Sequence, residues 1–475
     1  MPYHANLTFF YFKLTLYKPN IDYVRKFYFY IKDYLVLTIA AAFTSITLAI
    51  FNYLSYYIFD YIDLRLNANW QNVLTVLSLD LCLIVINGFL IHLINRTGVN
   101  IFVIEKRIHN REWIKVGLNL ALTFATCYIS FTLGLALGAE NAMTIIGGLL
   151  GYLFYRLTGL HKKRGFLIGA AMGFSIALSN PFVGVSIYLE SYDKRASGKN
   201  ILKVIYASFV AYLFYSLLVN DYHHSSIFFE NVDEYLTGIE TTVLILIPII
   251  VIIVGYVFSN GIFLIKKLFQ KHIPEYVDFL LALAIAVGLR FFYPQVLGTG
   301  DEFFKYVNIY EPILGLFVYL IVRYIFILFS FNANFNGGMV IPTLAFGAAL
   351  GEFLVISTDS YFGFDQNQAV IIMLITMLCF YAYVTGSYLT SLFLCFTFIH
   401  VQYIVIPLLF ALLITYKINS RTLHFDGISS IMLKMDEVNR YKVMPIFKSF
   451  DKPRLSENDI YKIKRKRALR KKHNL

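Results

Sequence analysis

Long stretches without a charged side chain constrain this chain more than any other feature. A helix needs about 20 apolar residues to cross the hydrocarbon core of a bilayer. Asp, Glu, Lys and Arg are absent for at least that long in residues 34–59, 116–139, 165–189, 241–265, 324–351 and 366–416. The pattern predicts an all-α, polytopic membrane protein.

The composition agrees with a lipid environment. Only 15% of the 475 residues are charged, whereas soluble proteins have about 25%. Lys and Arg number 41 against 29 Asp and Glu, and they lie at the chain ends and between the apolar stretches. Such placement indicates positive loops on the cytoplasmic side rather than binding of nucleic acid.

The two ends of the chain are expected to be cytoplasmic segments. Residues 1–32 are basic and contain no pattern of a cleaved signal peptide. Residues 417–475 are polar and end in a basic run, which predicts contact with anionic lipid headgroups. The transmembrane domain is predicted at 33–416, with two repeats at about 33–220 and 240–416.

Several apolar stretches have the wrong length for one simple span. Residues 366–416 are about two spans long and contain Gly386 and Pro407 as interruptions, while residues 141–155 are too short to cross alone. Helices that end inside the membrane leave this pattern, and they line substrate sites in transporters.

A glycine spacing occurs once in each half of the chain. Gly138 is followed by glycines at 147 and 151, and Gly338 is followed by glycines at 347 and 351. Glycine is common in membrane helices, so coincidence is one explanation. Small residues at such intervals also let helices pack closely, and the repeat favours two half-helices with similar starts.

Glu140 is the strongest candidate for a functional residue. An ionisable group between apolar runs is costly in a membrane, and this one is expected at the start of a helix after Gly138. A helix N-terminus attracts a carboxylate or a free anion, so the two can compete for it. Capping of its own helix is the alternative role.

Other polar segments give weaker indications. Residues 336–342 begin the second half-helix without an acid, so only backbone amides are available to an anion there. Thr97 lies in a polar break at 95–100 and offers a hydroxyl, although this break is also consistent with an ordinary turn.

No pattern of an enzyme is present in the sequence. It lacks the His-Glu-x-x-His and Gly-x-Ser-x-Gly motifs, and the turn at 298–301 lacks the Lys-Ser/Thr end of a nucleotide-binding loop. The four cysteines have no metal-ligand spacing. Single polar residues in or beside apolar runs are expected to be hydrogen-bonded helix contacts: Asp80, His92, Arg323 and His400.

Taken together, the motifs resemble the CLC family of chloride channels and proton-coupled chloride antiporters. Residues 138–142 are similar to the family's Gly-Lys/Arg-Glu-Gly-Pro segment, and residues 338–342 to its Gly-x-Phe-x-Pro segment. Residues 179–185 resemble its Asn-Ala-Pro-Leu-Ala-Gly segment, and residues 297–300 a later glycine-rich turn. Their order agrees over about residues 70–430.

The resemblance implies roles for particular residues. Glu140 would be the gate, and the backbone amides of Met339 and Val340 would bind the anion. Thr97 would stand in place of the family's serine. Phe425 or the neighbouring histidine would replace its central tyrosine.

Departures from the family's pattern bear on mechanism. Ser191 occupies the position of the internal proton-carrying glutamate, directly after Glu190. A serine cannot carry that charge, so weak proton coupling is expected unless Glu190 or water substitutes. Asn141 and Ala142 replace a glycine and a proline beside the gate, which leaves the anion preference open to fluoride.

The resemblance further implies chloride transport by a homodimer with one pore per subunit and inverted repeats that bring broken helices to a midplane anion site. It implies a plasma-membrane protein with both termini in the cytoplasm and no covalent cofactor. Channel and antiporter mechanisms both stay open. The rival hypotheses are selectivity for another small anion, transport of organic solutes on another fold, and an intramembrane enzyme that acts on lipid.

Overall fold

The computed structural model describes residues 30–55, 86, 104–105, 107–108, 114–192, 196–219, 241–272, 275–300, 312–332, 337–398 and 404–422. Within these residues the protein is helical, and a single pair of bridged residues is its only β-type contact. A first helix spans Tyr30–Ser55. The later helices are α4 Val116–Thr132, α5 Glu140–Leu157, α6 Lys162–Ala177, α7 Pro181–Ile187, the π-helix η1 Tyr188–Tyr192, α8 Gly198–Leu218, α9 Thr241–His272, α10 Glu275–Phe292, the 3-10 helix η3 Pro294–Val296, α11 Ile313–Asn332, α12 Val340–Phe362, α13 Gln366–Thr385, α14 Tyr388–Phe398 and α15 Val405–Thr422.

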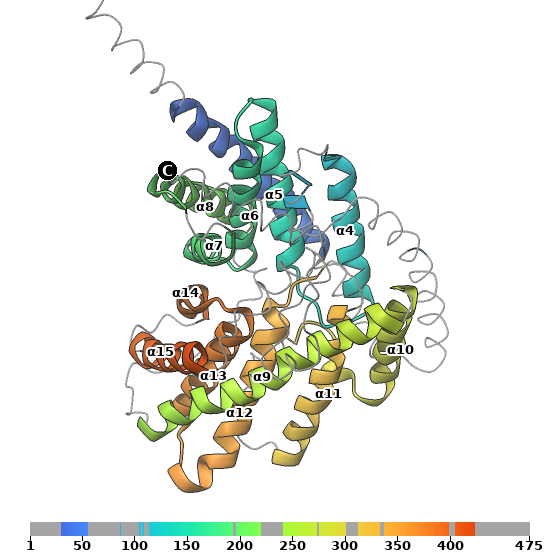
Figure 1. The fold of residues 1–475 in the computed structure, drawn as a ribbon, viewed down its shortest axis with the longest axis vertical. Coiled ribbons are helices and arrows are strands. Elements are labelled where there is room, and N and C mark those ends of the chain that lie inside the picture. Colours follow the sequence, from blue (N-terminus) through green and yellow to red (C-terminus); the bar gives the residue numbers. More distant parts are fainter. Residues whose placement is uncertain are drawn as a thin grey trace, which may run out of the picture.

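The described helices form two halves that meet in the middle of the molecule. Helices α5 to α8 lie together in the upper half of Figure 1, and α9 to α15 lie in the lower half. Each half has its own buried apolar core, and the core of the second half extends into the segment before α5. The segment before α5 therefore lies where the two cores adjoin.

Matching helix pairs confirm the repeat expected from the glycine spacing. In the first half, Gly147 and Gly151 of α5 lie against the backbone of α6, where an added Cβ would collide with the carbonyl oxygens of Gly169 and Gly165. In the second half, a Cβ on Gly351 of α12 would lie 2.6 Å from the Cα of Met373 in α13. Close approach of two helices needs small residues at the contact.

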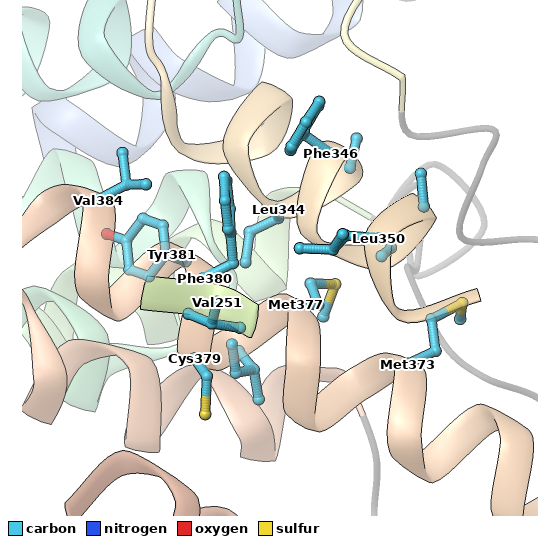
Figure 2. Close-up of a cluster of buried hydrophobic side chains, with 14 of the residues drawn as sticks. Val251, Leu344, Phe346, Leu350, Met373, Met377, Cys379, Phe380, Tyr381 and Val384 are labelled. Atoms are coloured by element: carbon cyan, nitrogen blue, oxygen red, sulfur yellow. The ribbon is translucent and has the colours of Figure 1, made fainter. Parts of the chain in front are cut away.

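The second of these pairs also forms the densest apolar packing. Figure 2 shows Leu344, Phe346 and Leu350 of α12 facing side chains of α13. All three are at most 4% exposed, and nearly all of α13 is buried. A helix that is apolar around its whole circumference belongs in the interior of a large membrane protein.

The long uncharged stretches are broken as expected, although one break lies elsewhere than predicted. Residues 165–189 divide into α6 and α7 at Asn180, and Gly386 ends α13 with a positive φ of 76°. Pro407 does not interrupt a helix, because it lies in the first turn of α15. Proline is tolerated there since the first turn needs no intrahelical amide donor.

Six described helices are long and apolar enough to cross a membrane. They are Tyr30–Ser55, α8, most of α9, α11, α12 and α13. Three shorter apolar helices, α4, α14 and α15, accompany them. Length and composition thus agree with a multi-pass membrane protein.

Candidate anion site

Two glycines, 200 positions apart, join the starts of α5 and α12. The amide of Gly138 donates to the carbonyl of Gly338 over 2.9 Å, and the amide of Gly338 donates back to the carbonyl of Gly138 over 2.6 Å. Helix α5 begins two residues after Gly138, and α12 begins two residues after Gly338. The bridge therefore brings two helix N-termini, with their partial positive charges, to one place.

Glu140 lies at this junction. It is the first residue of α5 and is only 3% exposed. Its carboxylate oxygen Oε1 accepts a hydrogen bond from the backbone amide of Ile341 in the first turn of α12, at 3.1 Å. The carboxylate of one half-helix thus occupies the N-terminus of the other.

The two bridging glycines make room for this carboxylate. A Cβ built on either Gly138 or Gly338 would collide with carboxylate oxygen Oε2 of Glu140. Any side chain at these positions would push the carboxylate away from the helix starts. Glycine is required here for close approach rather than for a positive φ.

Glu190 lies in a second arrangement of the same kind. It belongs to the π-helix η1, which directly continues α7. Its oxygen Oε1 accepts from the amide of Leu389 at 2.7 Å, and Oε2 accepts from the amide and the hydroxyl of Thr390 at 3.0 and 2.6 Å. The carboxylate thereby caps the N-terminus of α14.

Polar side chains of α7 hold this second arrangement in register. Asn180 donates to the carbonyl of Phe393 at 3.0 Å and to the hydroxyl of Thr397 at 3.1 Å. The hydroxyl of Ser186 hydrogen-bonds that of Thr390 at 3.0 Å. Helices α7 and α14 therefore pack through a row of hydrogen bonds that ends at Glu190.

One tyrosine connects the surroundings of the two glutamates. Tyr381 of α13 is 1% exposed and interacts electrostatically with both Glu190 and Glu140. Figure 2 shows its ring at the edge of the apolar cluster, with the hydroxyl directed away from Phe380. The buried Tyr381 hydroxyl is therefore a polar group in the surroundings of both carboxylates, which lie on different helices.

The structure brings some of the expected site residues together and shows one that sequence reasoning missed. Met339 is the N-cap of α12 and Val340 its first residue, next to the Glu140 carboxylate. The amide that contacts this carboxylate belongs to Ile341, which the family motif did not single out. Its place in the same first turn was the available signal, because every amide of that turn lacks a partner within the helix.

The remaining candidates are less informative. Ser191 follows Glu190 in η1 and is half-buried. Thr97 and Phe425 lie outside the described residues. Arg323 is hydrogen-bonded as expected, but its guanidinium donates at 2.9 Å to the carbonyl of Gly298, which lies in the turn after η3 rather than in a helix. The three described cysteines are free and buried.

A family model decides the identity of the chain. The model described as "voltage gated chloride channel" matches residues 81–420, which is more than half of the sequence. The chain belongs to this family, the CLC family of channels and antiporters. It is therefore an anion-transport protein by family, and the resemblance seen in the motifs is confirmed.

Solved structures of CLC proteins share the fold. A slow cyanobacterial Cl⁻/H⁺ antiporter matches with a TM-score of 0.74 and 15% identity, over 85% of this chain and 97% of the other. A CLC-type fluoride/proton antiporter matches with a TM-score of 0.66 and 14% identity, over 82% and 96%. A eukaryotic CLC transporter matches at 0.68 and 14%, over 86% and 74%. A comparison with curated proteins by sequence finds no match.

Proposed function

We propose that this CLC protein carries chloride through a path between the N-termini of α5 and α12, with Glu140 as the gate. One observation carries the proposal: the Glu140 carboxylate occupies the position at the start of α12 that an anion would take, bound to the Ile341 amide. The Gly138–Gly338 bridge holds both helix starts at this position.

Gating follows from competition between two anions. While the carboxylate is charged and seated, it blocks the path and satisfies the helix dipole. Protonation of Glu140 removes its charge, and a chloride ion can also displace it. Either event frees the amides of Met339, Val340 and Ile341 for the ion. These amides carry no full charge, so they bind the anion weakly enough to release it.

The inner part of the path is proposed to involve Thr97 and Phe425. The Thr97 hydroxyl would donate to the anion as the family's serine does. Phe425 would narrow the inner side without donating a hydrogen bond.

Coupling to protons is proposed to be weak. Ser191 cannot carry the proton that the family's internal glutamate carries. Glu190 is the remaining acid, and both of its carboxylate oxygens already accept hydrogen bonds from the start of α14. A proton that enters here would pass Tyr381, which interacts with both Glu190 and Glu140.

Fluoride is the second candidate anion. A CLC-type fluoride/proton antiporter shares the fold with a TM-score of 0.66. Asn141 follows the gate where the family has glycine, which is a departure from the pattern of the family beside Glu140. Parallel measurements of chloride and fluoride efflux from the same vesicles distinguish the two anions.

We also propose a cellular location and an oligomeric state for the protein. The protein would be a homodimer in the plasma membrane, with one path per subunit and both termini in the cytoplasm. The basic residues at the chain ends support this orientation. The transport domain would comprise residues 33–416, divided into inverted repeats at about 33–220 and 240–416.

Anion efflux from liposomes tests the function. Purified protein is reconstituted in chloride-loaded vesicles, and chloride and external pH are recorded together. We expect chloride efflux that rises as the pH falls, because protonation of Glu140 opens the path. We expect Glu140→Gln to remove this pH dependence while efflux continues.

Glu352→Gln is the matched control, since Glu352 of α12 is also a buried glutamate. The control should keep the pH dependence of the wild type. A steep pH response that survives in Glu140→Gln contradicts the gate. Absence of both chloride and fluoride efflux contradicts anion transport, and turnover of lipid by the same vesicles would then favour the enzyme hypothesis.

A further inference from the structure

Arg323 is a fully buried arginine whose guanidinium donates to backbone carbonyls at the end of η3 and in the turn that follows it. It belongs to α11 and is 0% exposed. Its guanidinium donates to the carbonyls of Val296, Gly298 and Thr299. We call residues 296–300 the glycine turn. An arginine keeps its charge when buried, so each of these bonds is charge-assisted.

The glycine turn is shaped to receive this side chain. Gly298 and Gly300 have φ values of 71° and 85°, which glycine adopts without strain. A Cβ on Gly300 would lie 2.6 Å from Nη2 of Arg323. The turn and the arginine therefore fit each other closely.

The glycine turn is hydrogen-bonded to the segment that leads to Glu140. We call residues 133–139, between α4 and α5, the gate segment. The amide of Gly298 donates to the carbonyl of Gly134 at 2.8 Å. Contacts thus run without interruption from Arg323 through the glycine turn to the start of the gate segment.

Helix α11 also forms a direct hydrogen bond with the gate segment. The hydroxyl of Ser330 accepts a hydrogen bond from the amide of Ala136 at 3.2 Å. Ser330 follows Arg323 by seven residues, about two helical turns, so both project from one face of α11. The gate segment then continues through the Gly138 bridge to Glu140.

We infer that Arg323 is a positioning residue for the gate: through the glycine turn it fixes the gate segment so that the Glu140 carboxylate stays seated on α12. The inference rests on the proposed function, because it assigns a role in gating. Without the guanidinium, the carbonyls of Val296, Gly298 and Thr299 lose the hydrogen bonds that Arg323 donates to them. The bond from the Gly298 amide to the Gly134 carbonyl of the gate segment would then come from a turn that Arg323 no longer fixes.

Other titratable groups near the gate are few in the described part of the chain. Cys127 of α4 and Tyr381 of α13 interact electrostatically with Glu140. The hydrogen bonds between Arg323 and the glycine turn involve neither of these residues. A change in gating caused by Arg323 is therefore attributed to the position of Glu140 and is measured against a variant that lacks its carboxylate.

The test is a double-mutant cycle in chloride-loaded liposomes. The readout is the ratio of chloride efflux at acidic pH to efflux at neutral pH. Because a loosened carboxylate blocks the path less well, we expect Arg323→Met to lower this ratio by about tenfold through leak at neutral pH. Arg323→Lys, which keeps the charge, should restore part of the ratio, and Ser330→Ala should lower it in the same direction by less.

In the Glu140→Gln background the ratio is expected to be near one already, so the quantity compared there is chloride efflux at neutral pH. Arg323→Met should change that efflux by less than about twofold, since no carboxylate is left to position. Arg290→Met, which removes an arginine from the neighbouring helix α10, is the matched control and should behave as the wild type. If Arg323→Met does not yield folded protein, Arg323→Lys and Ser330→Ala carry the test.

Each outcome is decisive. A wild-type ratio in Ser330→Ala and in the Arg323 variants overturns the positioning role and leaves the proposed function intact. An equal effect of Arg323→Met with and without Glu140 also overturns it, because a general loss of structure does not depend on the gate. Absence of anion efflux in the wild type instead contradicts the proposed function itself.

Discussion

At the scale of single residues, the surroundings of Glu190 determine how readily a proton can enter. Three donors from the start of α14 bind its carboxylate. We expect Glu190→Gln to lower the free energy of unfolding by about 2 kcal/mol, because the amide nitrogen of Gln replaces one carboxylate oxygen and cannot accept the bonds made to it. The ratio of protons to anions transported should stay nearly unchanged, since this carboxylate is bound to the start of α14 rather than free to carry a proton.

Thermal stability of the purified protein and the flux ratio in liposomes check this prediction together. Ser191→Ala is the control, because Ser191 adjoins Glu190 in η1. A large drop in proton movement with unaltered thermal stability would instead make Glu190 a proton carrier.

At the scale of helices, contact between α5 and α6 depends on glycine facing glycine. A Cβ on Gly147 would collide with the carbonyl oxygen of Gly169. We expect Gly147→Ala to separate the two helices and to cost about 2 kcal/mol by overpacking. The measurement is the fraction of protein that stays monodisperse in detergent after heating. Gly117→Ala in α4 is the control, since nothing lies within 4 Å of a Cβ there.

The short helices raise a question at the scale of the whole molecule. Helices α7 and α14 contain 7 and 11 residues, too few to cross a bilayer. They lie between α8 and α15 along the left edge of Figure 1. Phe182 of α7 and Phe396 of α14 are 48% and 46% exposed in the single chain. A second copy of the chain would cover them.

Mass and thiol reactivity check the dimer. We expect a protein mass in detergent of twice the 54.7 kDa of one chain. Phe396 of α14 and Phe317 of α11 are similarly exposed in the single chain, at 46% and 48%. Phe396→Cys should react with a maleimide more slowly than Phe317→Cys, because the second copy covers α14. Equal reaction rates and the mass of one chain would contradict this assembly.

Much of the fold was predictable from local pattern. Uncharged stretches marked the membrane helices, because a charge in hydrocarbon is costly and its absence is visible in a single sequence. The glycine spacing after Gly138 and Gly338 predicted the duplicated helix starts. The position of Glu140 shortly after Gly138 predicted that this acid lies at the first of them. The position of a helix break was less predictable, as Pro407 shows, because proline fits a first turn as well as a break.

The sequence by itself determined that this protein is helical, lies in a membrane and carries one acid at the start of a half-helix. Tertiary structure alone decided that this acid sits on the Ile341 amide of α12, that Glu190 caps α14, and that Arg323 holds the glycine turn. Each of these contacts joins residues between 24 and 201 positions apart. Burial and charge leave a local pattern in a sequence, whereas a contact between distant segments depends on how whole helices pack.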